Sequence, residues 1–283
     1  MVKVRDDYPP DAVAAARAVL VEITHVLGEY RNRMVIVGGW VPALLLSGGE
    51  AHVGSTDVDV ALNHSAEIDE VYTRISATLQ AHGYVQHEAA PFIWHKDVDL
   101  GTGTVVVEVD FLAGEYGGTA KSHRHQRTQG MMPRKTRGAD MLLLGEVEER
   151  VVESRLPNGA IDRVTVRVAG IVPFIVMKCS ALRGRINDKD AYDIYFCLRN
   201  YPDGVTAVAQ RFVPFATHGL VLEAIATLKD KFASPEHFGP KSVADFEEAI
   251  GEEAERLRRD VFEQVAALVA AIQAAGSSAP WCP

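Results

Sequence analysis

The sequence predicts an α+β fold, in which a mixed sheet flanked by helices is followed by a helical C-terminal domain. Up to residue 168, short β-branched runs alternate with amphipathic stretches of helical spacing. From Ile171 onward, nearly all apolar residues follow helical spacing. A length of 283 residues suits two modest domains or one large one. We therefore expect an α/β domain over residues 1–168 and a helical domain over residues 169–283.

The first elements are an alanine-rich helix over residues 11–27, which Gly28 ends, and a short buried strand over residues 34–37. Gly38 and Gly39 follow this strand directly. Residues 40–47 are then predicted to be helical, because a proline is tolerated in the first turn of a helix.

Alternation of polar and apolar residues predicts most of the remaining strands. An amphipathic helix near residues 68–79 separates the first of them from the rest, and a Pro-Asn-Gly turn predicts a hairpin near the end of the domain. The expected strands are residues 57–62, 84–87, 92–95, 104–112, 151–156 and 161–168.

The composition is that of a folded protein, with 47% hydrophobic and 24% charged residues. A formal net charge of −9 excludes a general polycation, so any nucleic-acid contact needs a local basic patch. Three cysteines without CxxC spacing indicate a reducing compartment. The N-terminus is polar, and the longest apolar stretch is interrupted by glycine and proline. We expect a soluble cytoplasmic protein without a membrane partner.

Two acidic pairs share one geometry. Asp57 and Asp59 lie two residues apart on one predicted strand, and Glu108 and Asp110 repeat this spacing on a later strand. Side chains two apart on a strand leave the same face, so neighbouring strands would bring the acids into one cluster. Hard divalent cations bound by carboxylate oxygens would neutralise such a cluster and serve phosphoryl transfer. Alternatively, each pair is the solvated face of a half-buried sheet.

The step from strand to helix at Gly38-Gly39 is a second candidate feature. Paired glycines let backbone N–H groups approach a phosphate, although a double glycine is also typical of a tight turn. The segment has neither the GxGxxG pattern of a dinucleotide site nor the GxxxxGK[ST] pattern of a P-loop.

Taken together, Gly38-Gly39, the Asp57-Val58-Asp59 strand 18 residues after Gly39, and the later Asp110 resemble the nucleotidyltransferase superfamily of DNA polymerase β-like enzymes. The resemblance implies the nucleotidyltransferase fold, with Asp57, Asp59 and Asp110 as catalytic acids that bind Mg²⁺ or Mn²⁺. It also implies a triphosphate cradle at Gly38-Gly39. The family often has Gly-Ser where this chain has Gly39-Trp40. Trp40 therefore stands where the family's serine would contact the nucleotide. Its ring either stacks on a base or packs in the core.

The helical half extends the resemblance. Lys178 lies within the apolar stripe of a predicted helix, where a lysine needs a partner unless it reaches the rim. Lys178, Ala181-Leu182-Arg183 and Lys189-Asp190-Ala-Tyr-Asp193-Ile resemble the signature of the AbiEii/AbiGii toxins. These are nucleotidyltransferase toxins of type IV toxin–antitoxin systems, including mycobacterial toxins that add nucleotides to tRNA 3′ ends.

What this second resemblance implies concerns the nucleotide. Lys178 would contact its phosphates, with Arg183 also in the nucleotide-binding set. Either Asp190 or Asp193 would be the distal catalytic or lysine-positioning acid, and the pattern does not choose between them. An NTP, a tRNA and an antitoxin protein would be the partners.

The one cationic segment is residues 121–137, with six Lys or Arg residues and no Asp or Glu. It is either a mobile loop that binds the phosphates of tRNA or a nucleotide, or a solvated loop. His123 and His125 lack the further ligands that a metal site needs.

The function that we predict is metal-dependent transfer of a nucleotide from an NTP to a tRNA 3′ end, as in a toxin–antitoxin toxin. Two alternatives remain. One is a small-molecule nucleotidyltransferase of the antibiotic-modifying kind, which the acidic charge would suit. The other is a non-catalytic nucleotide-binding protein on the same fold.

Overall fold

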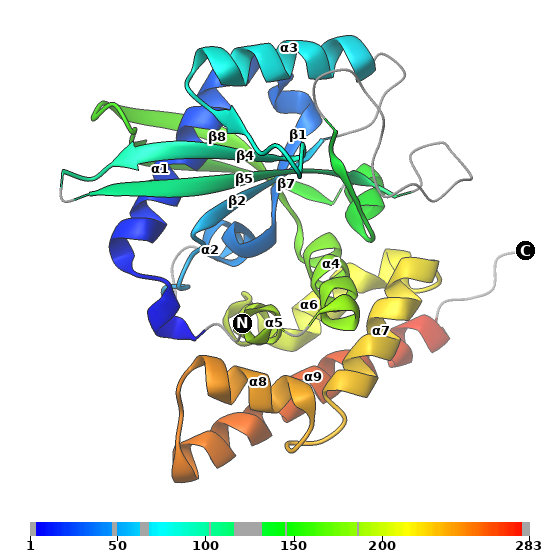
Figure 1. Cartoon of the computed structure of the whole chain (residues 1–283). Helices are drawn as coiled ribbons and strands as arrows, with labels where there is room; N and C mark the ends of the chain where they lie inside the picture. Colours follow the sequence, from blue (N-terminus) through cyan, green and yellow to red (C-terminus); the bar gives the residue numbers. More distant parts are fainter. Residues whose placement is uncertain are drawn as a thin grey trace, which may run out of the picture. The chain divides into compact units, whose positions relative to one another are not determined.

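The computed structural model describes residues 4–46, 50–62, 68–101, 103–115, 132–144, 146–185 and 187–278. The chain forms two compact units, each considered separately below. The α/β unit comprises Tyr8–Leu45 and Gly54–Gly170, and the helical unit comprises Met1–Asp7, Leu46–Val53 and Ile171–Pro283. The predicted order of a mixed sheet with helices followed by a helical region is confirmed (Figure 1).

The α/β unit is built on an eight-stranded mixed sheet with the order β3-β4-β5-β2-β1-β8-β7, and β6 pairs with β5 outside this path. The pairs β2–β5, β1–β8 and β5–β6 are parallel, and the other pairs are antiparallel. The strands are β1 (Met34–Val37), β2 (Asp57–Leu62), β3 (Val85–Gln86), β4 (Ile93–Asp99), β5 (Thr104–Gly114), β6 (Arg134–Thr136), β7 (Val147–Arg155) and β8 (Ile161–Ala169).

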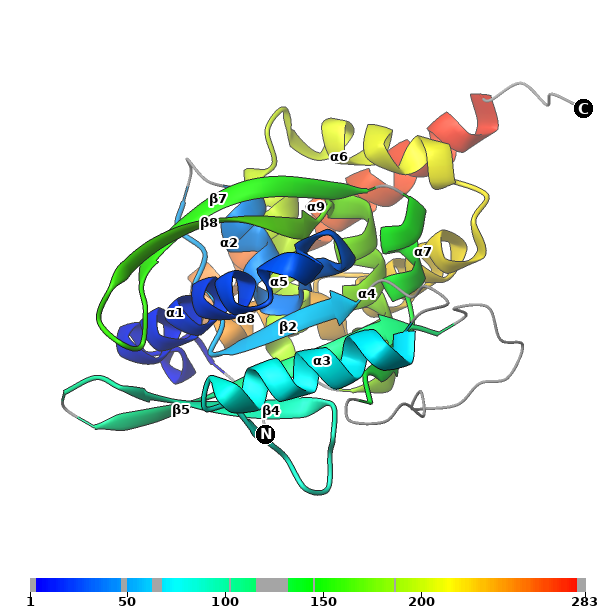
Figure 2. The same cartoon turned by 90° about the horizontal axis from the view of Figure 1, so that it is seen from above.

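Helices cover this sheet. The long helix α1 (Pro10–Val26) contacts β2, β5, β7 and β8, and most of its apolar residues from Ala15 to Ile23 are buried. The helix α3 (Ile68–Ala81) contacts β3 (Figure 1). The short α2 (Val41–Leu45) packs on β7 and β8, the two strands of the hairpin in Figure 2. The 3₁₀ helices of this unit are η2 (Gly28–Arg33), η3 (Gly38–Trp40) and η4 (Ala139–Leu144).

Two predicted elements need correction. The helix expected over residues 40–47 is shorter in the structure. Trp40 belongs to the 3₁₀ turn η3, which begins at Gly38 with a left-handed φ of 67°, and the five-residue α2 follows. The basic segment expected to be a loop ends in the strand β6, which pairs with the end of β5.

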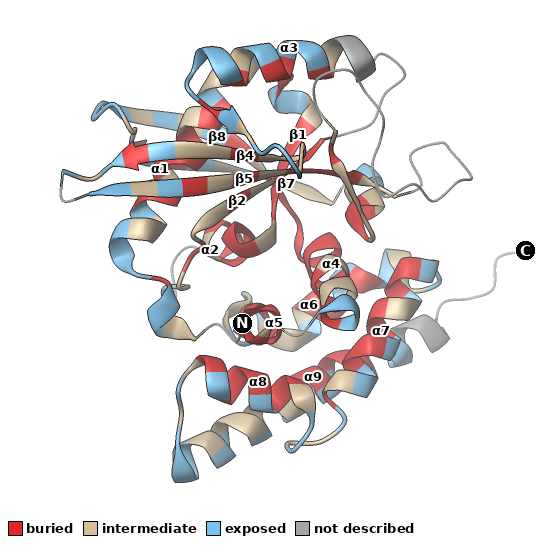
Figure 3. Cartoon of the chain, viewed as in Figure 1, coloured by how far each residue is buried: buried red, intermediate tan, exposed pale blue. Residues whose placement is uncertain are grey.

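The helical unit is centred on α5 (Asp188–Asn200). This helix packs against four others, and every residue from Asp188 to Leu198 is buried (Figure 3). The remaining helices are η1 (Arg5–Asp7), α4 (Ile171–Gly184), α6 (Gly204–Phe212), η5 (Val213–Phe215), α7 (Gly219–Lys231), α8 (Phe238–Phe246) and α9 (Gly251–Ser278). A helix buried on all sides must find partners for its polar residues, and these partners form one of the clusters described below.

Within the described residues, no helix is long and apolar enough to cross a membrane. Cys179 and Cys197 are buried free thiols, and burial raises the pKa of both, as expected of packing residues.

Candidate functional site

Four acidic residues meet where β2 and β5 run side by side. The two strands are parallel, with Asp57 opposite Glu108 and Asp59 opposite Asp110. The two acidic pairs therefore share one face of the sheet, as the two-residue spacing predicts for neighbouring strands. We call Asp57, Asp59, Glu108 and Asp110 the carboxylate cluster.

The end of β1 closes against this cluster. Val37 is opposite Asp59 in the β1–β2 register, and Gly38 follows with φ of 67°. A Cβ atom built on Gly38 would lie 1.8 Å from Oδ2 of Asp59. Only a glycine fits here, both because of the left-handed backbone and because the carboxylate occupies the place of a side chain.

The pKa of Asp110 is shifted well above its usual range. Burial and the nearby negative charges, Asp59 first among them, raise the pKa of Asp110 to about 8. Its Oδ1 atom is buried and accepts no hydrogen bond from any described residue. A buried carboxylate oxygen without a donor is costly unless a cation or a ligand group reaches it.

The only described cation bonded to Asp110 is Arg134 of β6, whose Nη2 lies 3.4 Å from Oδ2 of Asp110. The guanidinium also sits 5.2 Å from the ring centroid of Phe92, which steadies it by a cation–π contact. Its positive charge lowers the pKa of Asp110 but does not offset the carboxylates around it.

The donor types and the register of this cluster suit a hard divalent cation, which prefers carboxylate oxygens. The Oδ1 atom of Asp110, which has no donor among the described residues, and the glycine beside Asp59 also favour a divalent cation at this cluster. Yet in the described parts of the chain no three acidic, histidine or cysteine side chains converge as a ready metal site. Asp57 is instead hydrogen-bonded by Ser55, and Asp110 by Arg134. Metal binding would have to draw the carboxylates together.

Trp40 and Gly39 lie beside the cluster but are buried. Trp40 is 2% exposed, and its Nε1 atom donates to the backbone oxygen of Asp57 at 2.8 Å. The indole thus fixes the start of β2, which agrees with the core role that we weighed against base stacking. Trp94 is also fully buried.

A second cluster lies within the helical unit, where α4 meets α5. Lys178 Nζ is 2.8 Å from Oδ1 of Asp190 and 2.7 Å from Oδ2 of Asp193. Lys178 is 8% exposed, so the lysine in the apolar stripe has two buried partners. Burial opposes its charge, but the two carboxylates outweigh burial and raise the pKa of Lys178.

Two further residues complete this lysine cluster. Lys189 Nζ lies 3.0 Å from Oδ1 of Asp193, and His52 Nε2 lies 3.0 Å from the same oxygen. Burial lowers the pKa of His52 to about 4, so its ring is neutral near pH 7. The adjacent cations hold the pKa of Asp193 below its usual range against the effect of burial. Because Asp193 is ionised and accepts the bond, Nε2 of the neutral ring must carry the proton.

The arginine of this cluster differs from the one that the sequence suggested. Arg183 pairs with Glu223 at 3.1 Å, and both side chains are exposed. Arg185 instead donates two hydrogen bonds to Asp190, at 2.9 and 3.2 Å, and its side chain is 56% exposed. The cluster thus holds two lysines and an arginine against two carboxylates, an excess of one positive charge.

Sequence reasoning missed His52, Lys189 and Arg185 as members of this cluster. Lys189 is within the motif that resembles the toxins but received no role of its own. His52 is 141 residues from Asp193 and follows no local pattern, so only the folded chain reveals the pair.

Part of the basic segment is visible. Arg134, Lys135 and Arg137 are half-buried, with Arg137 paired to Glu115 and Lys135 hydrogen-bonded to the Glu115 carbonyl. Its other cations, Lys121, Arg124 and Arg127, and the histidines His123 and His125 lie outside the described residues.

Comparisons with known proteins give distant structural similarities. No family model matches the sequence, and no curated protein matches it. The chain is similar to the crystal structure of JHP933 from Helicobacter pylori, with 12% identity and a TM-score of 0.44 over 95% of this chain and 97% of that one. It is also similar to an antigenic nucleotidyltransferase-like protein from Paracoccidioides brasiliensis, with 15% identity and a TM-score of 0.45 over 78% and 89% of the two chains. At these levels the site has to be judged from its own residues.

Proposed function

We propose that the chain is a metal-dependent nucleotidyltransferase. The observation that carries this proposal is the register of β2 and β5, which sets Asp59 opposite Asp110 while Gly38 leaves room for the Asp59 carboxylate. Acids on adjacent strands beside a glycine turn are the arrangement that the resemblance to the superfamily implies.

In this proposal the residues have separate roles. Asp57 and Asp59 would hold Mg²⁺ or Mn²⁺, with Asp110 completing the cluster, and the cation would neutralise phosphate charge and polarise a phosphoryl oxygen. The backbone N–H groups of the turn at Gly38 and Gly39 would cradle the triphosphate, with the Asp59 carboxylate packed against Gly38. Oδ1 of Asp110, which has no donor among the described residues, is the atom that accepts a proton from the attacking hydroxyl.

The reaction itself follows from this assignment. The hydroxyl oxygen of the acceptor bonds to the α-phosphorus of the NTP, the bond from that phosphorus to the bridging oxygen breaks, and pyrophosphate leaves. The hydroxyl proton passes to Asp110. Positioning and charge neutralisation supply the catalysis, as in phosphoryl transfer generally.

The lysine cluster is proposed to bind nucleotide phosphates. The three cations of the cluster and the exposed guanidinium of Arg185 support an anionic ligand. Asp190 bonds both Lys178 and Arg185, whereas Asp193 is fully enclosed by Lys178, Lys189 and His52. We therefore assign the positioning role to Asp190 and a structural role to Asp193.

The acceptor that we propose is the 3′ end of a tRNA, and the biological role is that of a toxin regulated by an antitoxin. This finer assignment rests on the resemblance to AbiEii/AbiGii toxins and on the basic segment, residues 121–137, of an otherwise acidic chain.

The test is to incubate the full chain with total tRNA, Mg²⁺ and each labelled nucleoside triphosphate in turn. Asp59→Asn removes one charge of the carboxylate cluster at nearly constant volume. Asp97→Asn is the matched control, because Asp97 is an exposed acid on β4 of the same sheet that stands opposite Val106 and not opposite a cluster residue. We expect label in tRNA with the wild type and Asp97→Asn, and a loss of at least about 100-fold with Asp59→Asn.

Other results would redirect or refute the proposal. NTP binding without transfer to tRNA would favour a small-molecule acceptor, which a panel of hydroxylated cationic compounds then tests. Equal transfer by Asp59→Asn and the wild type would exclude the carboxylate cluster as the catalytic site, and absence of NTP binding would exclude the enzyme altogether.

A further inference from the structure

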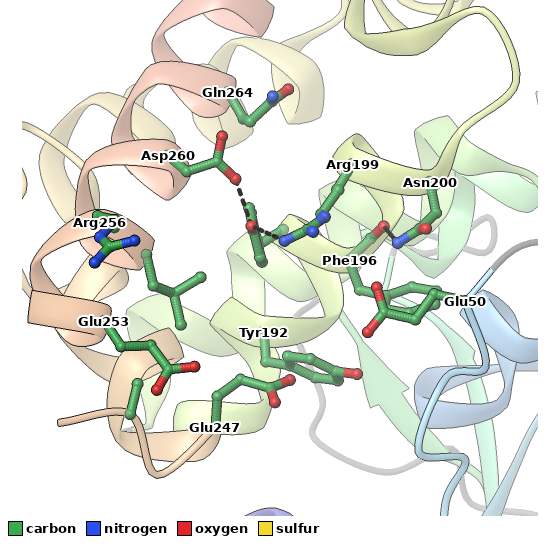
Figure 4. A pocket seen from close by; sticks show the side chains of 13 residues that line it. Glu50, Tyr192, Phe196, Arg199, Asn200, Glu247, Glu253, Arg256, Asp260 and Gln264 are labelled. Carbon is green, nitrogen blue, oxygen red and sulfur yellow. Dashed lines mark hydrogen bonds between the residues drawn. The ribbon is translucent and has the colours of Figure 1, made fainter.

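A pocket of about 580 Å³ lies between α5 and α9 of the helical unit (Figure 4). Residues of α5 and α9 line it, together with Glu50 and the segment between α8 and α9. This α5–α9 pocket is within the size range of small-molecule sites. Neither the carboxylate cluster nor the lysine cluster contributes a lining residue.

The charge on its walls is unbalanced. Four carboxylates face two guanidinium groups: Glu50, Glu247, Glu253 and Asp260 against Arg199 and Arg256. Both arginines already have partners, since Arg199 donates to the Tyr195 hydroxyl and Arg256 to Glu252. The lining therefore carries two more negative than positive charges.

Two of the four carboxylates are satisfied and two are not. Glu247 accepts both hydrogen bonds of Arg5, at 2.7 and 2.9 Å, and Asp260 accepts from Tyr195. Glu50 and Glu253 accept no hydrogen bond from any residue that the structure describes, and Glu50 interacts with Arg5 and Arg199 only through its charge. Negative charge is thus available at the edge of the pocket for a ligand.

A hydroxyl on a largely buried ring points to a ligand independently of the charges. Tyr192 lines the pocket and is only 2% exposed, with its ring stacked on Phe246 at 4.4 Å between centroids. Its hydroxyl makes no hydrogen bond within the described chain, and Figure 4 shows it on the pocket wall with Glu247 and Glu50. Because this side chain lines the pocket and its hydroxyl has no hydrogen-bond partner in the described chain, the hydroxyl is available to accept a hydrogen bond from a ligand donor.

From these observations we infer that the α5–α9 pocket binds an organic cation carrying alkylammonium or guanidinium groups. Glu50 and Glu253 offer counter-charges to such a cation, and the Tyr192 hydroxyl offers an acceptor for one of its N–H groups. Its size suits an extended chain with two or more charges rather than a single small ion. Such groups come either from a free polyamine or from an arginine or lysine side chain of a protein partner.

Calorimetric titration of the full chain with spermidine and, separately, with a tri-arginine peptide tests this inference. We expect at least one probe to bind with 1:1 stoichiometry. Glu50→Gln combined with Glu253→Gln should weaken this binding by at least about tenfold, and Tyr192→Phe by several-fold, because it removes only the hydroxyl and keeps the ring packed.

The control is Glu255→Gln combined with Glu263→Gln, which removes two exposed charges of α9 that do not line the pocket. This variant should bind within about twofold of the wild type. Preference for spermidine assigns the pocket to a free polyamine, and preference for tri-arginine assigns it to a partner's side chain. Absence of 1:1 binding, or an equal loss in the control variant, would overturn the inference and leave only diffuse attraction to an acidic protein. The result does not depend on nucleotidyltransferase activity.

Discussion

At the scale of single residues, Gly38 determines how near the backbone of β1 comes to the Asp59 carboxylate. The residue is constrained twice, by its left-handed φ and by the oxygen that fills the place of its side chain. These two constraints can be separated by experiment, because other glycines of the same unit have the first without the second.

We predict that Gly38→Ala destabilises the protein by about 2–4 kcal/mol and displaces Asp59, because a Cβ atom overlaps the carboxylate. Gly159→Ala is the matched control: Gly159 has a φ of 86° but nothing within 4 Å of an added Cβ, so backbone strain of about 1–2 kcal/mol is expected. Urea unfolding measures both. Equal losses would mean that the contact with Asp59 has no energetic weight.

A second residue-scale prediction concerns Arg134, the described cation bonded to Asp110. Arg134→Gln removes a charge that competes with a divalent cation, so Mn²⁺ should bind several-fold more tightly. Lys135→Gln is the control, since Lys135 is the next residue of β6 and contacts the Glu115 carbonyl instead. Calorimetry with Mn²⁺ gives the affinities. Weaker binding in Arg134→Gln would show that the guanidinium orders the cluster rather than competing with the metal.

The sequence was sufficient to predict the carboxylate cluster in outline. The spacing of Asp57 and Asp59 identifies one face of a strand, and Glu108 with Asp110 identifies another. The sequence did not predict that β2 pairs with β5, because this pairing depends on the strand order of the whole sheet. Arg134 was expected in a loop, because three residues of strand leave no recognisable period.

At the scale of elements, α5 shows why a buried helix can be polar. Its first turn carries Lys189 and Asp190, and Asp193 follows one turn later, all with less than 5% exposure. These charged residues are tolerated in a buried helix because they form ion pairs with one another and with Lys178 of α4. Asn187 is the N-cap of α5, and its side chain accepts from the backbone N–H of Lys189.

Asp193→Asn should therefore be strongly destabilising, by about 3–5 kcal/mol, because it leaves Lys178 and Lys189 with one buried carboxylate between them. Asp230→Asn is the comparison, since Asp230 is 73% exposed in its pair with Lys231 and should change stability by about 0.5 kcal/mol or less. Thermal unfolding distinguishes them. A small effect of Asp193→Asn would mean that the cluster is open to water.

His52 gives the helical unit a predictable response to acid. Its pKa is about 4 when folded and about 6.5 when unfolded, so the unfolded chain binds more protons between these values. Above pH 6.5, His52 does not reduce the free energy of unfolding. As the pH falls towards 4, protonation of His52 in the unfolded chain lowers this free energy by up to about 3 kcal/mol. In His52→Gln, the fall in unfolding free energy from pH 7 to 5 should be smaller than in the wild type. His82→Gln, at an exposed histidine, should retain the wild-type slope.

At the scale of the whole molecule, a net charge of −9 limits how nucleic acid can bind. The basic segment carries six cations, so the slope of log Kobs against log salt for tRNA should be no steeper than about −5. Lys135→Gln should reduce the slope by about 1, whereas Lys231→Gln, on α7 of the helical unit, should leave it unchanged. Filter binding across a salt series measures these slopes. A steeper slope would place the nucleic acid on other cations.

The α+β architecture followed from periodicity, because long alternating and helical stretches are strong local signals. The sequence did not predict that each unit is built from separate segments of the chain. Residues 46–53 belong to the helical unit although α/β elements lie on both sides of them in the sequence, and no composition change marks them. His52 belongs there because of its buried bond to Asp193, which is a tertiary interaction.

This discontinuity has a consequence for synthesis on the ribosome. The chain emerges from its N-terminus, so the α/β unit is complete once Gly170 has been translated, while Arg5 and His52 still lack the partners Glu247 and Asp193. The carboxylate cluster can thus form in a nascent chain before Lys178 exists. A ribosome that stalls between these points would hold a folded sheet with an incomplete protein, and the lysine cluster would form only after translation of α4 and α5.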